Sequence, residues 1–228
     1  MKTYAFIFAR GGSKGIPKKN LRVLDGIPLL AHSIRTAKNV DSISRIYVSS
    51  DDEEILSTAL DWGVEIIKRP RSLAEDDSPE WFAWRHAVES LPPFDTFVSV
   101  PTTAPLRNQN DIKKCIDLFM ESDVDVVVTG QKAARHPSFN MVKPMPNGCV
   151  QLVLPSNKEI SRRQDTDILY DLTTVAYVTS PAYILNKKSL FDGKVRIVEI
   201  PRHRAIDIDD ELDFAFAELL ISKKNEIN

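Results

Sequence analysis

Short apolar runs alternate with longer amphipathic stretches up to about residue 130 of the chain. The short runs are rich in β-branched and aromatic residues, which favour strands. They predict strands at residues 3–9, 45–49, 64–68, 96–100 and 125–129. The amphipathic stretches predict helices at residues 28–39, 52–62, 78–91 and 109–122. This alternation is typical of α/β proteins, so we predict a mainly parallel sheet with helices on both faces.

The alternation stops after about residue 130. Residues 136–165 are rich in Pro, Asn and Lys, with two short strand candidates at 139–143 and 149–154. Strand patterns return at 174–185 and 195–200. A last helix is predicted at about 210–223, with an apolar face of Leu212, Phe216, Leu219 and Leu220. We therefore expect one domain over residues 1–228, with a small inserted excursion at about 136–185.

Composition narrows the class of protein. The 228-residue chain is 43% hydrophobic, and 30 Lys and Arg residues nearly balance 32 Asp and Glu. A non-specific nucleic-acid binder needs excess cations, so we expect no nucleic-acid partner. No apolar run approaches the roughly 18 residues of a membrane span, and we expect no signal peptide. Two cysteines without metal-type spacing, Cys115 and Cys149, favour a reducing cytoplasm.

A glycine-rich, cationic segment follows the first predicted strand. Residues 8–21 read F-A-R-G-G-S-K-G-I-P-K-K-N-L. Their glycine spacing matches neither a Walker A loop nor a dinucleotide fingerprint. Glycines permit φ > 0 and close approach to a ligand, and the four cations suit a polyanion such as a triphosphate. A turn with solvated lysines is the alternative. The position at the carboxyl end of a strand, where α/β sheets bind ligands, favours the anion site.

An acidic pair lies near the other end of the chain. In Asp207-Ile208-Asp209, extended backbone would put both carboxylates on one face and Ile208 on the other. Neighbouring carboxylates repel each other unless a cation lies between them. Mg²⁺ fits, because it prefers oxygen ligands and usually keeps substrate phosphates in its shell. The alternative is a solvated turn in which Asp209 or Asp210 caps the last helix.

Two further polar segments are candidates for ligand binding. Arg162-Arg163-Gln164-Asp165 places adjacent arginines at the end of the excursion, and guanidinium groups bind carboxylate or phosphate bidentately. An exposed basic turn is the alternative. Asp51 and Asp52 follow the second predicted strand, where they could bind metal or ribose, or equally cap the next helix.

These segments carry a family resemblance. The sequence A-R-G-G-S-K-G-I-P-K-K-N-L closely resembles the opening signature of the N-acylneuraminate cytidylyltransferases. V-S-S-D-D, R-P, P-T-T-A-P-L-R, R-R-Q and D-I-D-D-E-L-D follow in the family's order, over nearly the whole chain. The resemblance implies a Rossmann-like nucleotidyltransferase α/β fold, CTP and an acidic nine-carbon sugar as substrates, Mg²⁺, and a homodimer.

The resemblance also implies residue roles. It assigns Arg10 and Lys14 to a triphosphate clamp, Asp207 and Asp209 to the metal, and Arg10, Lys14 and Asp209 to catalysis. The nucleotide-binding residues that it implies are Ala9, Arg10, Gly11, Gly12, Ser13, Lys14, Asn20, Arg69 and Ser78. For Arg69 a surface cation remains an alternative, and Ser78 could equally cap the following helix.

The acceptor side departs from the family pattern. Val100 stands where the family has glutamine, and Thr173 and Thr174 stand where it has asparagine and glycine. Asp171 adds an acid. A lost polar contact costs about 1–3 kcal/mol when its partner remains. We therefore expect an acidic ulosonate other than N-acetylneuraminate, with legionaminate-like, pseudaminate-like and deaminated sugars all open. The acceptor-binding residues are Val100, Thr102, Arg107, Arg163, Gln164, Asp171, Thr173 and Tyr177.

Three alternatives differ in chemistry. A nucleotidyltransferase for an octulosonate or a sugar 1-phosphate would share the fold and the loop. A nucleotide-sugar-dependent glycosyltransferase would use the Asp207–Asp209 pair for a diphosphate and would release a nucleoside diphosphate instead of pyrophosphate. A non-catalytic nucleotide-binding protein would show no turnover with any acceptor.

Overall fold

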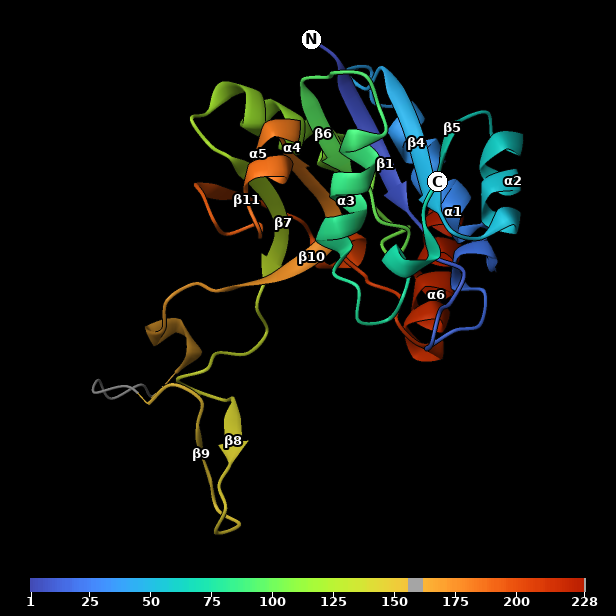
Figure 1. Ribbon diagram of the computed structural model, residues 1–228. Coiled ribbons are helices and arrows are strands. Elements are labelled where there is room, and N and C mark those ends of the chain that lie inside the picture. Colours follow the sequence, from blue (N-terminus) through green and yellow to red (C-terminus); the bar gives the residue numbers. More distant parts are fainter. Residues whose placement is uncertain (156–161, 228) are drawn as a thin grey trace.

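The computed structural model describes residues 1–155 and 162–227, and its centre is a seven-stranded sheet (Figure 1). The strand order is β11-β7-β10-β6-β1-β4-β5, and β10 alone runs antiparallel to its two neighbours. The strands are β1 (Thr3–Phe8), β4 (Arg45–Ser50), β5 (Glu65–Lys68), β6 (Thr96–Ser99), β7 (Val126–Lys132), β10 (Tyr170–Thr179) and β11 (Val195–Glu199). The predicted mainly parallel α/β sheet is confirmed.

Alternating side chains of β1 build a core on each face of this sheet. Ala5 and Ile7 pack among residues of the helices α1 (Leu29–Lys38), α2 (Glu53–Asp61) and α4 (Gln109–Glu121). Tyr4 and Phe6 point the other way. They pack among residues of α3 (Glu80–Glu89) and α5 (Pro181–Asn186). The sheet is therefore covered by helices on both faces, as the sequence predicts.

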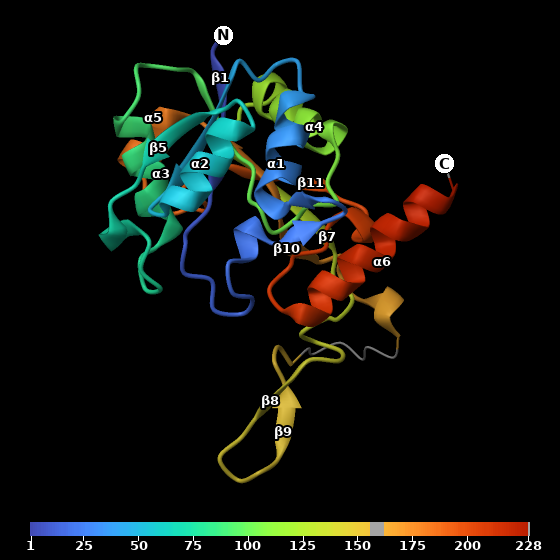
Figure 2. The same ribbon diagram turned by 90° about the vertical axis from the view of Figure 1, so that its right-hand side faces the viewer.

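Two small hairpins and a last helix complete the fold. β2 (Val23–Leu24) pairs with β3 (Ile27–Pro28), and α6 (Glu211–Ile227) packs beside this hairpin. β8 (Val142–Pro144) pairs with β9 (Val150–Leu152). Figure 2 shows this second hairpin extending away from the sheet, within the predicted excursion. Short 3₁₀ turns lie at Lys19–Leu21, Arg71–Leu73, Arg163–Asp165 and Arg202–Arg204.

Two elements differ from the sequence prediction. The strand predicted at 174–185 begins earlier, at Tyr170, and ends at Thr179. The hydroxyl of Ser180 then accepts the Tyr183 N–H, and Pro181 starts helix α5, so capping chemistry ends the strand.

The apolar face predicted for α6 is also wrong. Leu212, Phe216 and Leu219 are exposed, while the opposite side of the helix buries Phe214 and Ala217. The buried side packs against Ile16, Leu24, Leu29 and Ile208 of the N-terminal loop, the small hairpin, α1 and the acidic segment. The helix therefore ties the two ends of the chain together.

The connections create a switch point beside β1. From β1 the chain moves through β4 to β5 on one side, and then returns to β6 on the other side of β1. Ligands of open α/β sheets bind beyond the carboxyl ends of the strands at such a point. Within the described residues, no helix has both the length and the apolar character needed to cross a bilayer.

Candidate functional site

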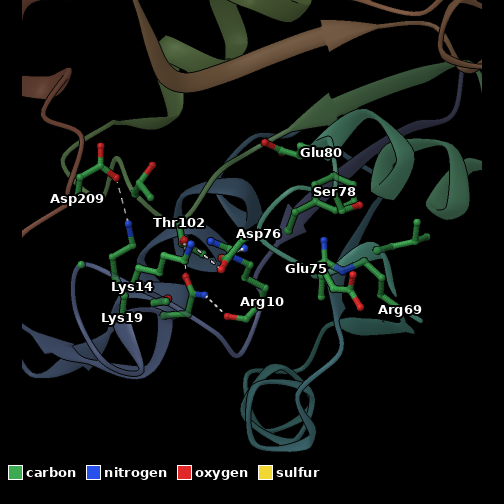
Figure 3. A pocket seen from close by; sticks show the side chains of 17 residues that line it. Arg10, Lys14, Lys19, Arg69, Glu75, Asp76, Ser78, Glu80, Thr102 and Asp209 are labelled. Atoms are coloured by element: carbon green, nitrogen blue, oxygen red, sulfur yellow. Dashed lines mark hydrogen bonds and ion pairs between the residues drawn. The ribbon is translucent and has the colours of Figure 1, made fainter. Parts of the chain in front are cut away.

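A cavity of about 570 Å³ opens beyond the carboxyl ends of β1 and β6. Four segments form its wall (Figure 3). They are the loop after β1, the connection from β5 to α3, the loop after β6, and the approach to α6. Of the predicted site residues, Arg10, Ser13, Lys14, Asn20, Arg69, Ser78, Thr102 and Asp209 line this cavity.

Arg10 and Lys14 converge on one carboxylate. Arg10 Nη1 lies 2.8 Å from Asp76 Oδ1, and Lys14 Nζ lies 2.7 Å from Asp76 Oδ2. The hydrogen bond from Lys14, together with Arg10, holds the pKa of Asp76 below its ordinary value. The two cations are thus arranged to share one anionic group within the cavity.

Two glycines of the loop, Gly11 and Gly15, let other segments of the chain approach the loop closely. Gly11, Gly12 and Gly15 all avoid the left-handed region, which Lys18 enters instead with φ 51°, so the predicted φ > 0 is wrong. A Cβ atom on Gly15 would collide with the carbonyl oxygen of Asp209. A Cβ atom on Gly11 would lie 2.6 Å from Asp52 Oδ2. The loop needs glycine at these two positions because other backbone and side-chain atoms approach so closely.

The two acids after β4 support the same loop. Asp51 Oδ1 accepts the Gly11 N–H at 3.1 Å. Asp52 caps α2 by accepting the N–H groups of Glu54 and Ile55, which settles one of the two alternatives for Asp52.

Asn20 fastens the loop to the end of β6. Its side chain is buried, its Nδ2 donates to the Arg10 carbonyl oxygen at 3.0 Å, and its Oδ1 accepts from Thr102 Oγ1 at 2.6 Å. Because both groups of the amide have partners inside the protein, Asn20 fixes the backbone at Arg10.

Lys19 joins the cationic loop to the acidic segment. Its Nζ donates to the Ile208 carbonyl oxygen at 2.7 Å and lies 3.3 Å from Asp209 Oδ1. Lys14, Lys19 and Asp209 therefore line one cavity although 190 residues separate Lys19 from Asp209. The sequence prediction counted Lys19 among the four cations of the loop but gave it no individual role in the site.

Ile208 lies between the two acids in sequence, and its side chain packs in the core. It is fully buried, whereas Asp209 is 77% exposed and lines the cavity. Asp207 is half-buried, and its Oδ1 is buried without a hydrogen-bond partner. Asp210 caps α6 by accepting the N–H groups of Leu212 and Asp213, which leaves Asp209 free of that role.

This donor set fits a magnesium ion that shares its ligands with substrate. Asp209 lines the cavity and lies 3.3 Å from Lys19 Nζ. Asp207 lies outside the cavity wall, with one oxygen buried without a hydrogen-bond partner and the Arg107 guanidinium as a charged neighbour. Within residues 1–155 and 162–227, no three His, Cys, Asp or Glu side chains group as a metal site. Two carboxylates suffice for Mg²⁺, which is commonly bound through one or two carboxylates plus phosphate oxygens.

Arg69 and Glu80 lie together with Ser78 in another part of the cavity (Figure 3). Arg69 is buried, its Nε has no partner, and burial lowers the pKa of its guanidinium. Its carboxylate neighbour, Asp51, lies 4.0 Å away. The alternative of a surface cation is therefore wrong for Arg69.

Glu80 was missed by the sequence prediction. Its Oε1 accepts the Trp84 indole N–H at 2.9 Å, and desolvation raises the pKa of its carboxyl group. The residue begins α3 and has surface open to the cavity, although the surrounding protein desolvates the carboxyl group. Ser78 does not cap α3: the capping position is Pro79, which makes no side-chain bond.

Several predicted residues lie outside the cavity wall. Ala9 and Val100 are fully buried in the core, which explains why Val100 is apolar where the family pattern is polar. Gly12 is exposed on the loop, with nothing within 4 Å of a Cβ position. Thr173 is buried on β10, and Tyr177 packs 5.8 Å from Trp84 between ring centroids. Desolvation raises the pKa of Tyr177 to about 12.

Arg107 is buried and links separate segments of the chain through its hydrogen bonds. Its guanidinium donates to Ser33 Oγ on α1 at 2.9 Å, to the Pro101 carbonyl oxygen, and to the Thr174 carbonyl oxygen on β10 at 3.3 Å. Burial lowers the pKa of Arg107, and nearby Asp207 opposes that shift. Arg107 therefore holds the loop after β6 against two other elements from a buried position, and its contact with the acceptor stays a prediction.

The remaining acceptor residues are dispersed. Gln164 lines a second cavity of about 580 Å³, with Lys132, Arg135 and His136. Asp171 is exposed on β10, opposite Gln131. The backbone of Arg163 begins a 3₁₀ turn, but its side chain lies outside the described part of the chain.

The chain is similar to known cytidylyltransferases in sequence and in fold. Residues 4–177 match the family model described as Cytidylyltransferase. The chain is 34% identical to CMP-N,N'-diacetyllegionaminic acid synthase of Campylobacter jejuni, covering 96% of this chain and 94% of that protein. It is 31% identical to pseudaminic acid cytidylyltransferase of Campylobacter jejuni, covering 99% of each. The solved CMP:2-keto-3-deoxy-manno-octonic acid synthetase complexed with CTP has the same fold, with a TM-score of 0.73, 14% identity, and coverage of 98% and 100%.

Proposed function

The chain belongs to the cytidylyltransferase family, and we propose that it transfers CMP from CTP to the C2 hydroxyl of an acidic nine-carbon ulosonate, releasing pyrophosphate. One observation carries this proposal: Arg10, Lys14, Lys19 and Asp209 line a single cavity at the switch point of the sheet. Cations for a triphosphate and a carboxylate for its metal ion thus meet where an α/β sheet binds nucleotides.

The two clamp cations hold the departing phosphates. Arg10 and Lys14 already share a carboxylate, Asp76, and a triphosphate would compete with Asp76 for them. Pyrophosphate gains negative charge as it leaves the α-phosphorus, so fixed cations stabilise the transition state more than the bound substrate. Asn20 keeps the Arg10 backbone in place, which limits the reorganisation needed during transfer.

Asp207 and Asp209 would hold Mg²⁺. When bound, the ion neutralises phosphate charge and lowers the pKa of a coordinated hydroxyl. The proposal is supported by the exposed Asp209 carboxylate in the cavity wall and by the Asp207 oxygen that has no hydrogen-bond partner. The chain's own contribution is the rigid support behind the pair, where Ile208 is buried and its N–H donates to the Thr103 carbonyl oxygen at 2.8 Å.

Positioning dominates the proposed reaction. The C2 hydroxyl attacks the α-phosphorus in line, the new O–P bond forms, the bond to pyrophosphate breaks, and the hydroxyl proton leaves to solvent. Phosphoryl and nucleotidyl transfers depend mainly on orientation and charge stabilisation.

We propose that the acceptor belongs to the legionaminate or pseudaminate type. The two relatives above act on such sugars by name. Asp171, exposed on β10, is the residue that we propose contacts the sugar, because a carboxylate can accept hydrogen bonds from its amide or hydroxyl groups.

We further propose a homodimer in the cytoplasm. Met141, Val142, Val150 and Leu154 are exposed along the projecting hairpin, and apolar patches of this kind often mark protein interfaces. Both cysteines are free thiols, which suits a reducing compartment. Sedimentation of the purified protein tests the dimer, and a single monomeric species at micromolar concentration would contradict it.

Pyrophosphate release tests the proposed function. The protein is incubated with CTP and Mg²⁺ and, separately, with N,N'-diacetyllegionaminate, pseudaminate, a deaminated nonulosonate, N-acetylneuraminate, an octulosonate and a sugar 1-phosphate. We expect release with the first two sugars. Preference for N-acetylneuraminate would remove the acceptor proposal, while preference for the octulosonate or the phosphate would replace the substrate class. Absence of release with every acceptor would contradict the reaction.

A further inference from the structure

We propose that the ion pair between Arg204 and Asp111 positions the acidic segment, Asp207-Ile208-Asp209, for metal binding. This inference rests on the proposed metal site and deepens it, because it names two positioning residues that lie outside the wall of the nucleotide cavity. Neither the sequence motifs nor the comparisons assign a role to Arg204 or Asp111.

The Arg204 guanidinium binds the Asp111 carboxylate through two hydrogen bonds. Its Nε donates to Asp111 Oδ2 at 2.9 Å, and its Nη2 donates to Asp111 Oδ1 at 3.0 Å. Asp111 is only 1% exposed, so its carboxylate lies out of water. A bidentate contact of this kind restricts the orientation of both groups, and a lysine ammonium cannot reproduce it.

Asp111 lies on a fixed part of the fold, in the first turn of α4. Its Oδ2 also accepts the Asn108 N–H at 3.0 Å, and Asn108 Oδ1 accepts the Asp111 N–H at 3.1 Å, which together form a capping box. The turns that follow are fastened to the core of the sheet, because Ile112, Cys115 and Ile116 are buried there. The ion pair therefore ties Arg204 to a rigid helix.

The acidic segment has no regular secondary structure, so attachments on both sides of each acid define its path. The Arg204 side chain is attached before the segment, and the Asp210 cap of α6 follows it. Within the segment, the buried Ile208 donates its N–H to the Thr103 carbonyl oxygen at 2.8 Å. Asp207 lies between the attachments at Arg204 and Ile208, so the direction of its carboxylate depends on both.

The ion pair acts on the metal site through geometry. Arg204 and Asp111 carry opposite charges at hydrogen-bond distance, so together they contribute little net field at the acidic segment. Buried ion pairs add little net stability, but they can fix one conformation. Ala205 also packs with Ala104, which limits the freedom of the chain between Arg204 and Asp207 while the pair is intact. Groups that orient the ligands of a metal commonly change its affinity by about 10–100-fold.

The test compares Arg204→Lys with the control Arg202→Lys. Arg202 is exposed on the same 3₁₀ turn, and its replacement makes the same chemical change. Binding of Mn²⁺ in the presence of CTP is measured by electron paramagnetic resonance, binding of CTP without metal by calorimetry, and stability by thermal melting. We expect the Kd of Mn²⁺ to rise about tenfold in Arg204→Lys, with unchanged binding of metal-free CTP. Arg202→Lys should change neither value.

Three further variants separate positioning from general destabilisation. Ile116→Val shortens a buried side chain of α4, so it should lower the melting temperature and leave Mn²⁺ affinity unchanged. Asp111→Asn keeps an acceptor for the Asn108 N–H but breaks the bidentate contact, so it should weaken Mn²⁺ binding as Arg204→Lys does, and it serves if Arg204→Lys fails to fold. Asp207→Asn removes the carboxylate through which the pair is proposed to act, so adding Arg204→Lys to it should cause little further loss.

Other outcomes separate this inference from the proposed function. Unchanged Mn²⁺ affinity in Arg204→Lys and Asp111→Asn would overturn the inference, and so would an equal loss in Ile116→Val or a full further loss in the double variant with Asp207→Asn. If Asp207→Asn alone leaves Mn²⁺ affinity unchanged, the metal assignment of Asp207 fails and the inference fails with it. If no acceptor yields pyrophosphate but Mn²⁺ affinities change as expected, the positioning role stands and the proposed reaction fails. Failure to bind CTP and Mn²⁺ would overturn both.

Discussion

The nucleotide side of the cavity and the proposed acceptor side are built in different ways. On the nucleotide side, Asn20 joins the loop after β1 to the loop after β6, and Lys19 joins it to the acidic segment. On the acceptor side, Gln164 lines another cavity and Asp171 lies on an exposed strand surface. The residues predicted for the nucleotide are therefore connected to one another within one chain, whereas those predicted for the acceptor are dispersed.

The largest predicted effect is that of replacing Asp209 on the nucleotide side, because this change should lower activity with every acceptor. We expect Asp209→Asn to lower kcat by about 10²–10³, the usual cost of losing a group that stabilises transition-state charge. The fold should persist, because the side chain is 77% exposed. Steady-state kinetics and thermal melting measure the two effects.

Asp210→Asn is the matched control. Asparagine also caps helices, so this neighbouring variant should keep its activity and its stability. Near-normal turnover in Asp209→Asn would remove the metal assignment for this residue.

Arg107 forms hydrogen bonds to both α1 and β10, and its replacement should lower the free energy of unfolding. Arg107→Ala removes the buried hydrogen bonds that the guanidinium donates to the Ser33 hydroxyl and to the Pro101 and Thr174 carbonyl oxygens, so we expect the free energy of unfolding to fall by about 2–3 kcal/mol. Denaturant titration measures this change. A variant with wild-type stability and a raised KM for the sugar alone would restore Arg107 to the acceptor side.

Lys14 tests the clamp within the nucleotide side. Lys14→Ala should lower kcat/KM for CTP by about 10–100-fold, because a charge-assisted contact to phosphate is lost. Lys18→Ala is the control, since Lys18 pairs with Glu54 and lies outside the cavity wall. Equal losses in both variants would point to general electrostatic attraction instead of a specific clamp.

Asp171 tests the acceptor side alone. We expect Asp171→Asn to raise KM for the sugar by about 5–10-fold, the net value of one ordinary hydrogen bond, because asparagine keeps an acceptor oxygen but loses the charge. KM for CTP should stay the same, because Asp171 is outside the nucleotide cavity. A change in KM for CTP of similar size would show that the two sides are not separate.

The smallest effect concerns stability and pH. The folded protein raises the pKa of Glu80 above its ordinary value near 4.5, so the folded state holds this proton more strongly. The free energy of unfolding therefore loses a contribution as pH rises from 4.5 through the folded pKa. Glu80→Gln lacks this loss, so its stability relative to wild type should increase between pH 4 and pH 7. A constant difference across that range would contradict the shift.

Local patterns were enough to predict the sheet and the cationic loop. Apolar residues occupy successive positions of β1, so both faces of this strand are buried. The loop that follows the carboxyl end of β1 must therefore lie at the edge of the sheet where ligands bind. The acidic pair was identified because Ile208 separates two carboxylates in an extended segment.

The residues that sequence reasoning missed depend on long-range packing. Leu212 and Phe216 have the helical spacing of a buried face, but the hairpin and the loop contact Phe214 and Ala217 instead. Glu80 looks like an ordinary first-turn acid until the fold places it beside Arg69 and Trp84. Arg107 was placed on the acceptor side because local sequence cannot reveal that Ser33 and Thr174 surround it.

A structure of the protein with CTP and Mn²⁺, located by anomalous scattering, tests the central claim most directly. The account predicts the triphosphate between Arg10 and Lys14, the metal beside Asp209, and the rest of the nucleotide in the same cavity toward Arg69. A nucleotide bound in the cavity of Gln164 and His136, or a metal away from both Asp207 and Asp209, would contradict it.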